Sequence, residues 1–392
     1  MPMKKLSSRI TALPTSAATA VDYMVKARRA AGCDVVSFCV GEPDFPTPPV
    51  PAEAGVRAIR EGKTGYTAPA GTPELRQAVC EAMERECGLA YTPSMVAVTT
   101  GAKYAVYAAV AAMAEDGDEF IIPTPCWPSY APIVTLCHGK VVYAEGSPER
   151  DYKISPETLR SVITERTKAL ILNDPCNPSG AVYDREELAA LMEVCREADL
   201  YVVADEVYSG ILYDGRSFVP AASVSRDAFE RTVTVSGVSK SYAMTGWRLG
   251  WACASEEIIK AMTVFLNHTT GNPSSIAQEA AVAALRSGDG DTERMSRIYE
   301  QRRNVLLSAL RELGLDCPTP AGAFYIMADV RSTALPDGND FAMALLEEEN
   351  VAVVPCADYG FPGFVRFAYT LDTEEMEEGI ARLRRFLGKE RP

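Results

Sequence analysis

The stretch ALILNDPCNPSGAVYDREELAALMEVCREADLYVVA (residues 169–204) decides the fold. It begins and ends with short apolar runs, Ala169–Leu172 and Tyr201–Ala204, which are typical of buried parallel strands. Between them, Asp184-Arg-Glu-Glu187 is a capping box, and apolar residues follow it at helical spacing. A strand, a helix and a strand in this order predict a parallel sheet with helices packed on its faces.

Further segments extend the pattern in both directions. Strand-like runs with Pro, Gly or Asp at their boundaries occur at Glu119–Ile122, Lys140–Tyr143 and Thr232–Val235. After a turn at 287–291 the pattern becomes a long amphipathic helix, and strand-like segments follow at 324–327, 351–354 and 365–369. This C-terminal part predicts a smaller α+β unit.

The first 45 residues are proline-rich and contain one helical stretch, so we expect them to pack on another part of the chain. We therefore predict an α/β protein with two domains. The large domain comprises residues 46–285 and carries the mostly parallel sheet. The small domain is discontinuous and comprises residues 1–45 and 286–392.

Composition excludes several classes of function. The chain has 392 residues and a net charge of −14, which disfavours nucleic acid and anionic membrane as partners. Its longest apolar run, Tyr104–Ala114, is shorter than the ~18 residues of a membrane-spanning helix, and no signal-peptide pattern is present. Eleven scattered cysteines and two histidines predict a reduced, cytoplasmic protein without a metal site.

Three polar residues follow predicted strands, at the edge where parallel sheets bind ligands. Asp205 ends a buried run, where an unpaired carboxylate is costly, so we expect it to face a cation. Asn177 lies in a proline-rich turn, and Lys240 follows the run Thr232–Val235. Taken singly, they could be a helix cap, a turn former and a solvated lysine. Together with phosphate donors, the amine and the acid are what a pyridoxal phosphate enzyme requires.

The sequence resembles the class I, fold-type I aminotransferases, most closely their bacterial and archaeal aspartate aminotransferase branch. The resemblance runs from about residue 10 to the C-terminus, and its most specific stretch is Ser239-Lys-Ser-Tyr-Ala-Met-Thr-Gly-Trp-Arg-Leu-Gly250. The supporting motifs are Gly41-Glu-Pro-Asp-Phe45, Tyr66-Thr-Ala-Pro-Ala-Gly71, Asn177-Pro-Ser-Gly180, Asp205-Glu-Val-Tyr208 and Val365-Arg-Phe367. The resemblance implies the fold-type I transferase fold and pyridoxal 5′-phosphate as cofactor.

The resemblance implies catalytic roles for Lys240, Asp205 and Tyr208. Lys240 corresponds to the lysine that forms a Schiff base with the cofactor and moves a proton to and from the substrate Cα. Asp205 corresponds to the partner of the pyridine nitrogen. Asn177 and Tyr208 correspond to the pair that hydrogen-bonds the O3′ oxygen of the cofactor. Because Lys240 must be a neutral amine at turnover, we expect its pKa to be lowered.

The phosphate of the cofactor has several expected partners. Gly101-Ala102-Lys103 opens a predicted helix, whose free N–H groups can hold an anion. Arg248 corresponds to the arginine that binds the phosphate. Ser239 is a further candidate, because the usual serine position three before the lysine is Gly237 here. Trp127 falls where an aromatic ring stacks on the pyridine ring.

The resemblance also implies the substrate contacts and the assembly. Arg366 corresponds to the arginine that grips the α-carboxylate, and Gly41 to the glycine whose N–H contacts the same group. Trp127 and Asn177 are expected to border the substrate as well. Tyr66 corresponds to a tyrosine that reaches the phosphate of the neighbouring subunit, so we expect a homodimer with shared active sites.

Substrate choice depends on Lys103, which corresponds to a lysine associated with the distal carboxylate of aspartate or glutamate. A cation at a helix start is electrostatically unfavourable unless it has such a role. One departure opposes this reading: the Ser-x-Thr turn of the branch appears as Ser16-Ala-Ala18, with Thr19 one place late. We therefore expect a hydroxyl to be missing beside the side-chain pocket.

These expectations define an aminotransferase that moves an amino group between an L-amino acid, aspartate or glutamate, and a 2-oxo acid by a ping-pong mechanism. An aminotransferase of broad, aromatic, prephenate or alanine specificity is an alternative. A pyridoxal phosphate-dependent lyase on the same fold is another, because a fold alone does not set the reaction. A non-catalytic ligand-sensing domain is disfavoured by the presence of both Lys240 and Arg366.

Overall fold

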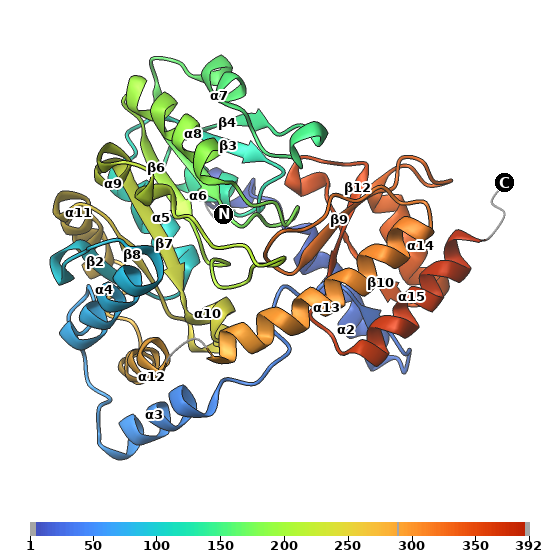
Figure 1. The fold of residues 1–392 in the computed structure, drawn as a ribbon, viewed down its shortest axis with the longest axis horizontal. Helices are drawn as coiled ribbons and strands as arrows, with labels where there is room; N and C mark the ends of the chain where they lie inside the picture. The colour runs from blue at the N-terminus through green and yellow to red at the C-terminus, as the bar shows by residue number, and fades with distance from the viewer. Residues whose placement is uncertain (1–4, 288–289, 389–392) are drawn as a thin grey trace.

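A seven-stranded sheet forms the centre of the larger of two lobes in the computed structural model, which describes residues 5–287 and 290–388 (Figure 1). Its order is β2-β8-β7-β6-β5-β3-β4, and the strands from β4 to β7 are parallel while β8 runs antiparallel to β7 and β2. The bounds are β2 (Val96–Thr99), β3 (Glu119–Thr124), β4 (Lys140–Glu145), β5 (Thr167–Asn173), β6 (Tyr201–Asp205), β7 (Thr232–Gly237) and β8 (Gly250–Cys253).

The crossover predicted from residues 169–204 is present. Helix α8 (Arg185–Glu197) starts at the expected capping box: the Glu187 N–H donates to Asp184 Oδ1 at 2.8 Å, and the Asp184 N–H donates to Glu187 Oε2 at 3.0 Å. Strands β5 and β6 then pair in parallel, so Asn173 and Asp205 end side by side at the same edge of the sheet. Local capping and strand pairing together place these two residues.

Both faces of the sheet are covered, which explains why its strands are apolar on both sides. In β5, Ala169 and Ile171 pack toward one face, and Leu170 and Leu172 pack toward the other. The first face carries α5 (Ala102–Met113), α6 (Tyr130–Leu136) and α11 (Glu256–Asn267), and the second carries α7 (Pro156–Val162), α8 and α9 (Arg226–Arg231). The β2–β8 end is covered by α4 (Pro73–Cys87) and α12 (Ser275–Arg286), and α3 (Pro49–Arg60) packs on α12.

The smaller lobe joins the two ends of the chain. Its strands are β1 (Val36–Ser37), β9 (Tyr325–Asp329), β10 (Val351–Ala352), β11 (Val354–Pro355) and β12 (Phe364–Ala368). Strand β1 pairs with β10, and β12 lies between β11 and β9. The run predicted at 351–354 is thus split between two short strands. The domain boundaries at 45/46 and 285/286 stay a prediction, and residues 288 and 289 of the expected turn lie outside the described part of the chain.

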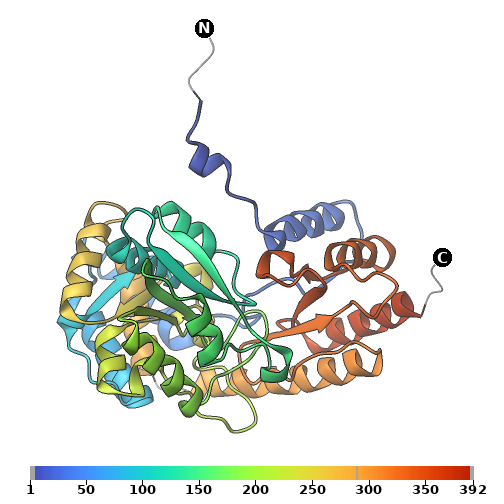
Figure 2. The same cartoon turned by 90° about the horizontal axis from the view of Figure 1, so that it is seen from above.

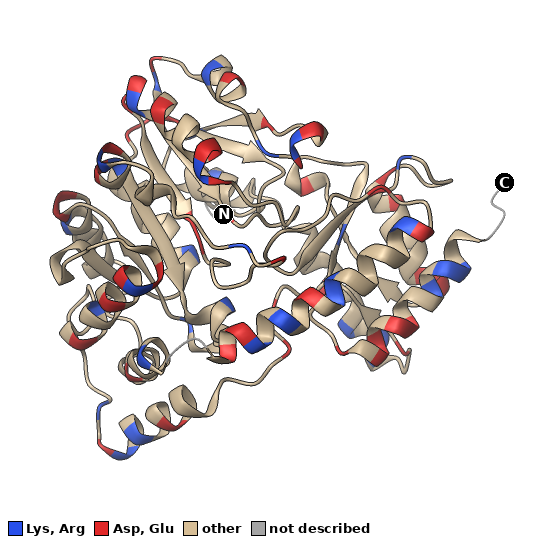
Figure 3. Cartoon of the chain, viewed as in Figure 1, with Lys and Arg blue, Asp and Glu red and all other residues tan. Residues whose placement is uncertain are grey.

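Four longer helices cover these strands: α2 (Ala17–Ala30), α13 (Gly290–Glu312), α14 (Gly338–Glu349) and α15 (Thr373–Leu387). Helix α2 lies beside the C-terminal helices, and the short α1 (Ser8–Thr11) precedes it (Figure 2). Charged residues lie mainly on the outer helices (Figure 3). Within residues 5–287 and 290–388, no helix combines the length and the apolar character needed to cross a bilayer.

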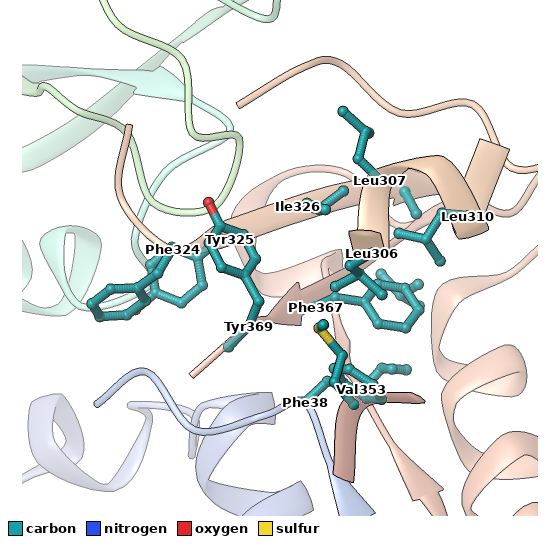
Figure 4. Close-up of a cluster of buried hydrophobic side chains, with 14 of the residues drawn as sticks. Phe38, Leu306, Leu307, Leu310, Phe324, Tyr325, Ile326, Val353, Phe367 and Tyr369 are labelled. Atoms are coloured by element: carbon teal, nitrogen blue, oxygen red, sulfur yellow. The ribbon is translucent and has the colours of Figure 1, made fainter. Parts of the chain in front are cut away.

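The core of the smaller lobe is built around α13. Leu306, Leu307 and Leu310 of this helix share one buried cluster with Phe38 of the N-terminal segment and Phe367 of β12 (Figure 4). The Phe38 and Phe367 rings meet edge to face with their centroids 5.4 Å apart. This core therefore holds the N-terminal segment against the C-terminal part of the chain.

Leu306→Ala should lower the free energy of unfolding by about 2–5 kcal/mol, because it removes a fully buried side chain from this core. Val305, the neighbouring residue on α13, is 44% exposed, and Val305→Ala should change the free energy by about 0.5 kcal/mol or less. Chemical denaturation of both variants tests the packing. Equal losses in the two variants would contradict it.

Candidate active site

A cavity of about 540 Å³ lies at the carboxyl ends of β5, β6 and β7, where the two lobes meet. Most residues singled out in the sequence line it: Gly41, Ala102, Lys103, Trp127, Asn177, Asp205, Tyr208, Ser239, Lys240, Arg248 and Arg366. Gly101 lies directly behind this lining, and Tyr66 lies outside it. The tertiary structure thus brings together residues that are more than 300 positions apart.

Asp205 ends β6 and is 5% exposed. Its Oδ2 accepts a hydrogen bond from the Tyr130 hydroxyl at 2.7 Å, whereas its buried Oδ1 has no partner. Burial raises the pKa of this carboxyl to about 6, and the hydrogen bond from Tyr130 opposes that rise. A buried, unpartnered carboxylate oxygen on a cavity wall fits a cationic N–H donor, such as a protonated pyridine nitrogen.

Lys240 follows β7 in the short helix α10 (Val238–Ser241). Its Nζ donates a hydrogen bond to the Gly41 carbonyl at 2.6 Å and lies 5.6 Å from the centre of the Phe324 ring. Burial lowers the pKa of this amine to about 8, and the charge of Glu42 opposes the shift. The lowered pKa that the sequence analysis expected agrees with an amine that must lose its proton to act as a nucleophile.

Asn177 and Tyr208 are each held by neighbouring residues of the cavity. The Asn177 N–H donates to Asn173 Oδ1 at 2.8 Å, and its own Oδ1 accepts from Arg366 Nη1 at 3.0 Å. The Tyr208 hydroxyl lies 2.9 Å from the Tyr325 hydroxyl. Both side chains are therefore fixed, and their contact with the O3′ oxygen of a cofactor stays a prediction.

The start of α5 and Arg248 form a cradle for an anion. Gly101 precedes the helix with φ +83°, and a Cβ there would lie 2.5 Å from Arg248 Nη2. A Cβ on Gly250 would lie 2.5 Å from the Ala102 backbone nitrogen. Glycine at these two positions lets the guanidinium and the free N–H groups of the helix approach the same space. This donor set fits a phosphate.

Arg366 lies in β12 and is 3% exposed. Its guanidinium donates to Asn177, to the Tyr359 hydroxyl at 2.9 Å and to the Cys39 carbonyl at 2.9 Å. It forms no ion pair with any described carboxylate, and its buried Nε has no partner. Because an uncompensated buried charge is costly, this arrangement fits an anionic ligand.

Lys103 and Trp127 lie next to each other on another wall of the cavity. Lys103 Nζ is 4.7 Å from the centre of the Trp127 ring, which meets Tyr130 edge to face at 5.2 Å. Lys103 is exposed toward solvent, and its partial desolvation at the cavity, together with the nearby charge of Arg248, lowers its pKa. Residues 5–287 and 290–388 supply no carboxylate that forms an ion pair with Lys103, so its charge is available to a ligand.

Tyr66 and Thr19 differ in whether the cavity of a single chain includes them. Tyr66 is fully exposed, so in a single chain it reaches no cavity group. The expectation of a missing hydroxyl was wrong: Thr19 lines the cavity, and its hydroxyl lies 2.9 Å from that of Ser16. Helix α2 begins at Ala17, and its turn places Thr19 and Asp22 on the cavity side despite the shift in sequence.

Sequence reasoning missed three tyrosines and a charge pair. Tyr130, Tyr325 and Tyr359 all line the cavity, and Asp22 forms an ion pair at 2.7 Å with Lys26 at its rim. Tyr130 belongs to the same Pro-Cys-Trp-Pro-Ser-Tyr segment as Trp127, so the sequence could have indicated that it lies at the site. Tyr325 and Tyr359 lie in strand-like or turn segments whose patterns indicate only burial.

A buried acid, an amine and an anion cradle at the edge of a parallel α/β sheet define the fold-type I class of transferases. The model of the family described as aminotransferase class I and II matches residues 33–383, and the chain belongs to this family. Both the predicted fold class and the predicted aminotransferase activity are confirmed.

Known proteins of this family match nearly the whole chain. The aspartate aminotransferase of Bacillus subtilis (strain 168) is 44% identical over 98% of this chain and 99% of that protein. The aspartate/prephenate aminotransferase of Thermus thermophilus is 43% identical over 99% of this chain and 100% of that protein. The solved structure of aspartate aminotransferase from Thermus thermophilus with maleate has a TM-score of 0.94 at 42% identity, covering 98% and 100% of the chains.

Asp205→Asn should stabilise the cofactor-free protein above pH 6. The carboxyl has a pKa of about 6 when folded and about 3.9 when unfolded, so the folded state loses stability as pH rises between these values. This difference of two pKa units corresponds to a loss of about 3 kcal/mol in the free energy of unfolding. The uncharged amide of the Asn variant does not incur this loss. Thermal unfolding should show a higher Tm for the variant at pH 8 and a smaller difference near pH 4.

Asp214→Asn is the matched control, because Arg303 lowers the pKa of that carboxyl. Removing the negative charge of Asp214 should destabilise the protein at pH 8, because the ion pair with Arg303 is lost. A lower Tm for Asp205→Asn at pH 8 would show that Asp205 is stabilising as an anion without a ligand.

Proposed function

We propose that this aminotransferase binds pyridoxal 5′-phosphate in the cavity and exchanges amino groups between aspartate or glutamate and 2-oxo acids. The observation that carries the proposal is the set of groups that one cavity brings together without an ion-pair partner among the described residues: the amine of Lys240, the carboxylate of Asp205 with its unpartnered Oδ1, and the cradle at Gly101 and Arg248. Each is a group that a different part of the cofactor requires.

The cofactor, when bound, supplies a carbonyl carbon for amines and a conjugated ring that accepts electrons from the substrate Cα. Asp205 would hold a proton on the ring nitrogen, because its buried oxygen otherwise lacks a partner. Arg248 and the α5 start would hold the phosphate, with Ser239 as a further donor. Trp127 would cover one face of the ring, and Tyr208 and Asn177 would bind the O3′ oxygen.

Lys240 has two tasks in this proposal. As a neutral amine it would bind the cofactor, and once displaced by the substrate amine it would carry the proton between Cα and the cofactor. The pKa of about 8 keeps a usable fraction of the amine neutral near physiological pH, while the protonated form remains accessible for returning the proton. A fully exposed lysine would be almost entirely protonated under the same conditions.

The charges of the cavity match a dicarboxylic substrate. Arg248, Arg366 and Lys103 are three cations without ion-pair partners among the described residues, and each can serve one anionic group. Once the phosphate occupies Arg248, Arg366 would take the α-carboxylate, assisted by the Gly41 N–H. Lys103 is then left for a distal carboxylate. The names of the relatives, aspartate and aspartate/prephenate aminotransferases, support this assignment.

The active unit would be a homodimer in which the partner subunit's Tyr66 completes the phosphate site. Tyr66 is fully exposed, and α3 beside it also exposes Val50, Val56 and Ile59. Exposed apolar groups of this kind mark contact surfaces when they gather on one element. We place the enzyme in the cytoplasm, since all eleven cysteines are free thiols.

Lys240→Ala should abolish both the absorbance of lysine-bound cofactor and transaminase turnover, because no other amine occupies this position. The control is Lys140→Ala, which changes an exposed lysine on the edge strand β4. Absorbance spectra and a coupled assay with aspartate and 2-oxoglutarate measure the two properties. Undiminished turnover in Lys240→Ala would remove the proposal.

Lys103→Ala should lower kcat/KM for aspartate and glutamate by roughly 10- to 100-fold, the value of a charge-assisted hydrogen bond. Alanine, phenylalanine and leucine should be little affected, because they have no distal carboxylate. Stopped-flow absorbance with single amino acids and no acceptor measures the first half-reaction. If a neutral or aromatic amino acid leads in the unmodified enzyme, the acidic substrate assignment is wrong while the family membership stands.

The same experiment separates transamination from a lyase reaction. An aminotransferase releases one 2-oxo acid per active site and then stops until an acceptor is added. A lyase would release product continuously without an acceptor.

A further inference from the structure

We propose that Tyr325 is a positioning residue of this active site, which orients the hydroxyl of Tyr208 and holds the guanidinium of Arg366. The role rests on the proposed function, because its consequences are read on the bound cofactor and on carboxylate binding. Tyr325 is 1% exposed, lines the cavity and contacts three groups of the site.

Strand geometry explains why Tyr325 can reach Arg366. Strands β9 and β12 are antiparallel, with Arg366 opposite Met327 and Tyr325 two residues before Met327. Residues two apart lie on the same face of a strand, so Tyr325 is a diagonal neighbour of Arg366, within reach of an aromatic side chain. The Arg366 Cζ lies 4.4 Å from the centre of the Tyr325 ring.

The ring supplies support that the hydrogen bonds of Arg366 do not. Asn177, Tyr359 and Cys39 accept hydrogen bonds from the Nη atoms of the guanidinium, which also lies over the Tyr325 ring at 4.4 Å and, farther away, over the Tyr359 ring at 5.5 Å. Cation–π contact favours the charged group in this dry position. The guanidinium of Arg366 must be in place before an α-carboxylate arrives. Holding it in position should therefore favour substrate binding.

The hydroxyl of Tyr325 acts on Tyr208. The two hydroxyl oxygens are 2.9 Å apart, and either can be the donor. When Tyr208 donates its proton to O3′ of the cofactor, its oxygen can only accept from Tyr325. In that arrangement Tyr325 donates the hydrogen bond between the two hydroxyls, and this bond favours the orientation in which the Tyr208 proton points to O3′. A hydrogen bond from Tyr325 also makes Tyr208 a better donor, since linked hydrogen bonds polarise one another.

Gly41 completes the arrangement. A Cβ on this residue would lie 2.5 Å from the Tyr325 hydroxyl oxygen, so the tyrosine occupies space that only glycine leaves free. The carbonyl of the same glycine accepts the hydrogen bond from Lys240. Tyr325 thus packs against the loop that contacts the lysine, in addition to Tyr208 and Arg366.

The first test is Tyr325→Phe, which removes the hydroxyl and keeps the ring. A donor on O3′ lowers the pH at which lysine-bound cofactor loses its proton, so weakening that donor should raise the midpoint of the absorbance titration by about half a pH unit. Tyr208→Phe should raise it further. In the double variant, Tyr325→Phe should add nothing, because its effect passes through Tyr208.

The second test is Tyr325→Leu, which removes the ring. Binding of succinate, a dicarboxylate without an amino group, should weaken by about 10-fold, whereas Tyr325→Phe should retain most of the affinity. Tyr369→Phe is the control for structural damage, since this buried tyrosine bonds Tyr213, 3.1 Å away, and does not line the cavity. It should leave the midpoint and succinate binding unchanged, whatever its effect on Tm.

The outcomes separate the inference from the proposed function. If the unmodified protein shows no absorbance of lysine-bound cofactor, the proposed function fails. If it shows this absorbance and Tyr325→Phe leaves the midpoint unchanged, or shifts add in the double variant, the orienting role is overturned. Unchanged succinate binding in Tyr325→Leu overturns the role toward Arg366.

Discussion

The structure depends on charged groups that the protein buries without neutralising them itself. Arg366 and Asp205 are buried and Lys240 is partly buried; all three line one cavity, and the described chain offers none of them an ion pair. Burial alone makes such groups costly, and the pKa values of Asp205 and Lys240 shift toward their neutral forms as a result. A ligand with the complementary charges would offset this cost, and it would find Asp205 and Arg366 already buried and held by hydrogen bonds.

Each lobe contributes one part of this cavity. The parallel sheet brings Asn173, Asp205 and the start of the Lys240 segment to one edge, since parallel strands end at the same side. The smaller lobe adds Arg366 and Tyr325 on neighbouring antiparallel strands. The cavity therefore exists only when the lobes pack together, and the residues proposed to bind substrate and cofactor come from different structural units. Tyr325 spans this division, because it contacts Arg366 on its own lobe and Tyr208 on the other.

Three glycines of the site allow close contacts that a larger residue would prevent. Gly101 and Gly250 keep Arg248 and the α5 start close enough to share one anion, and Gly41 leaves room for the Tyr325 hydroxyl. A methyl group at any of these positions would clash with the group that lies against the glycine. Gly41 and Gly250 do not have positive φ angles, so close packing and not backbone conformation requires glycine there, whereas Gly101 has both a positive φ and a close neighbour.

Local sequence was sufficient for the strands of the parallel sheet and the capping box at Asp184, because these depend on short-range periodicity. Ordered motifs singled out Lys240, Asp205 and Arg248, which line one cavity, while their roles stay predictions. Local sequence did not predict the antiparallel strand β8 or the split of residues 351–354 into two strands. Both depend on pairing partners far along the chain. Thr19 was misjudged because a helix start, not the residue count, decides which side chain faces the cavity. The contacts of Tyr325, Tyr359 and Tyr130 were decided only by tertiary packing, because a buried tyrosine has the same local pattern wherever its hydroxyl points.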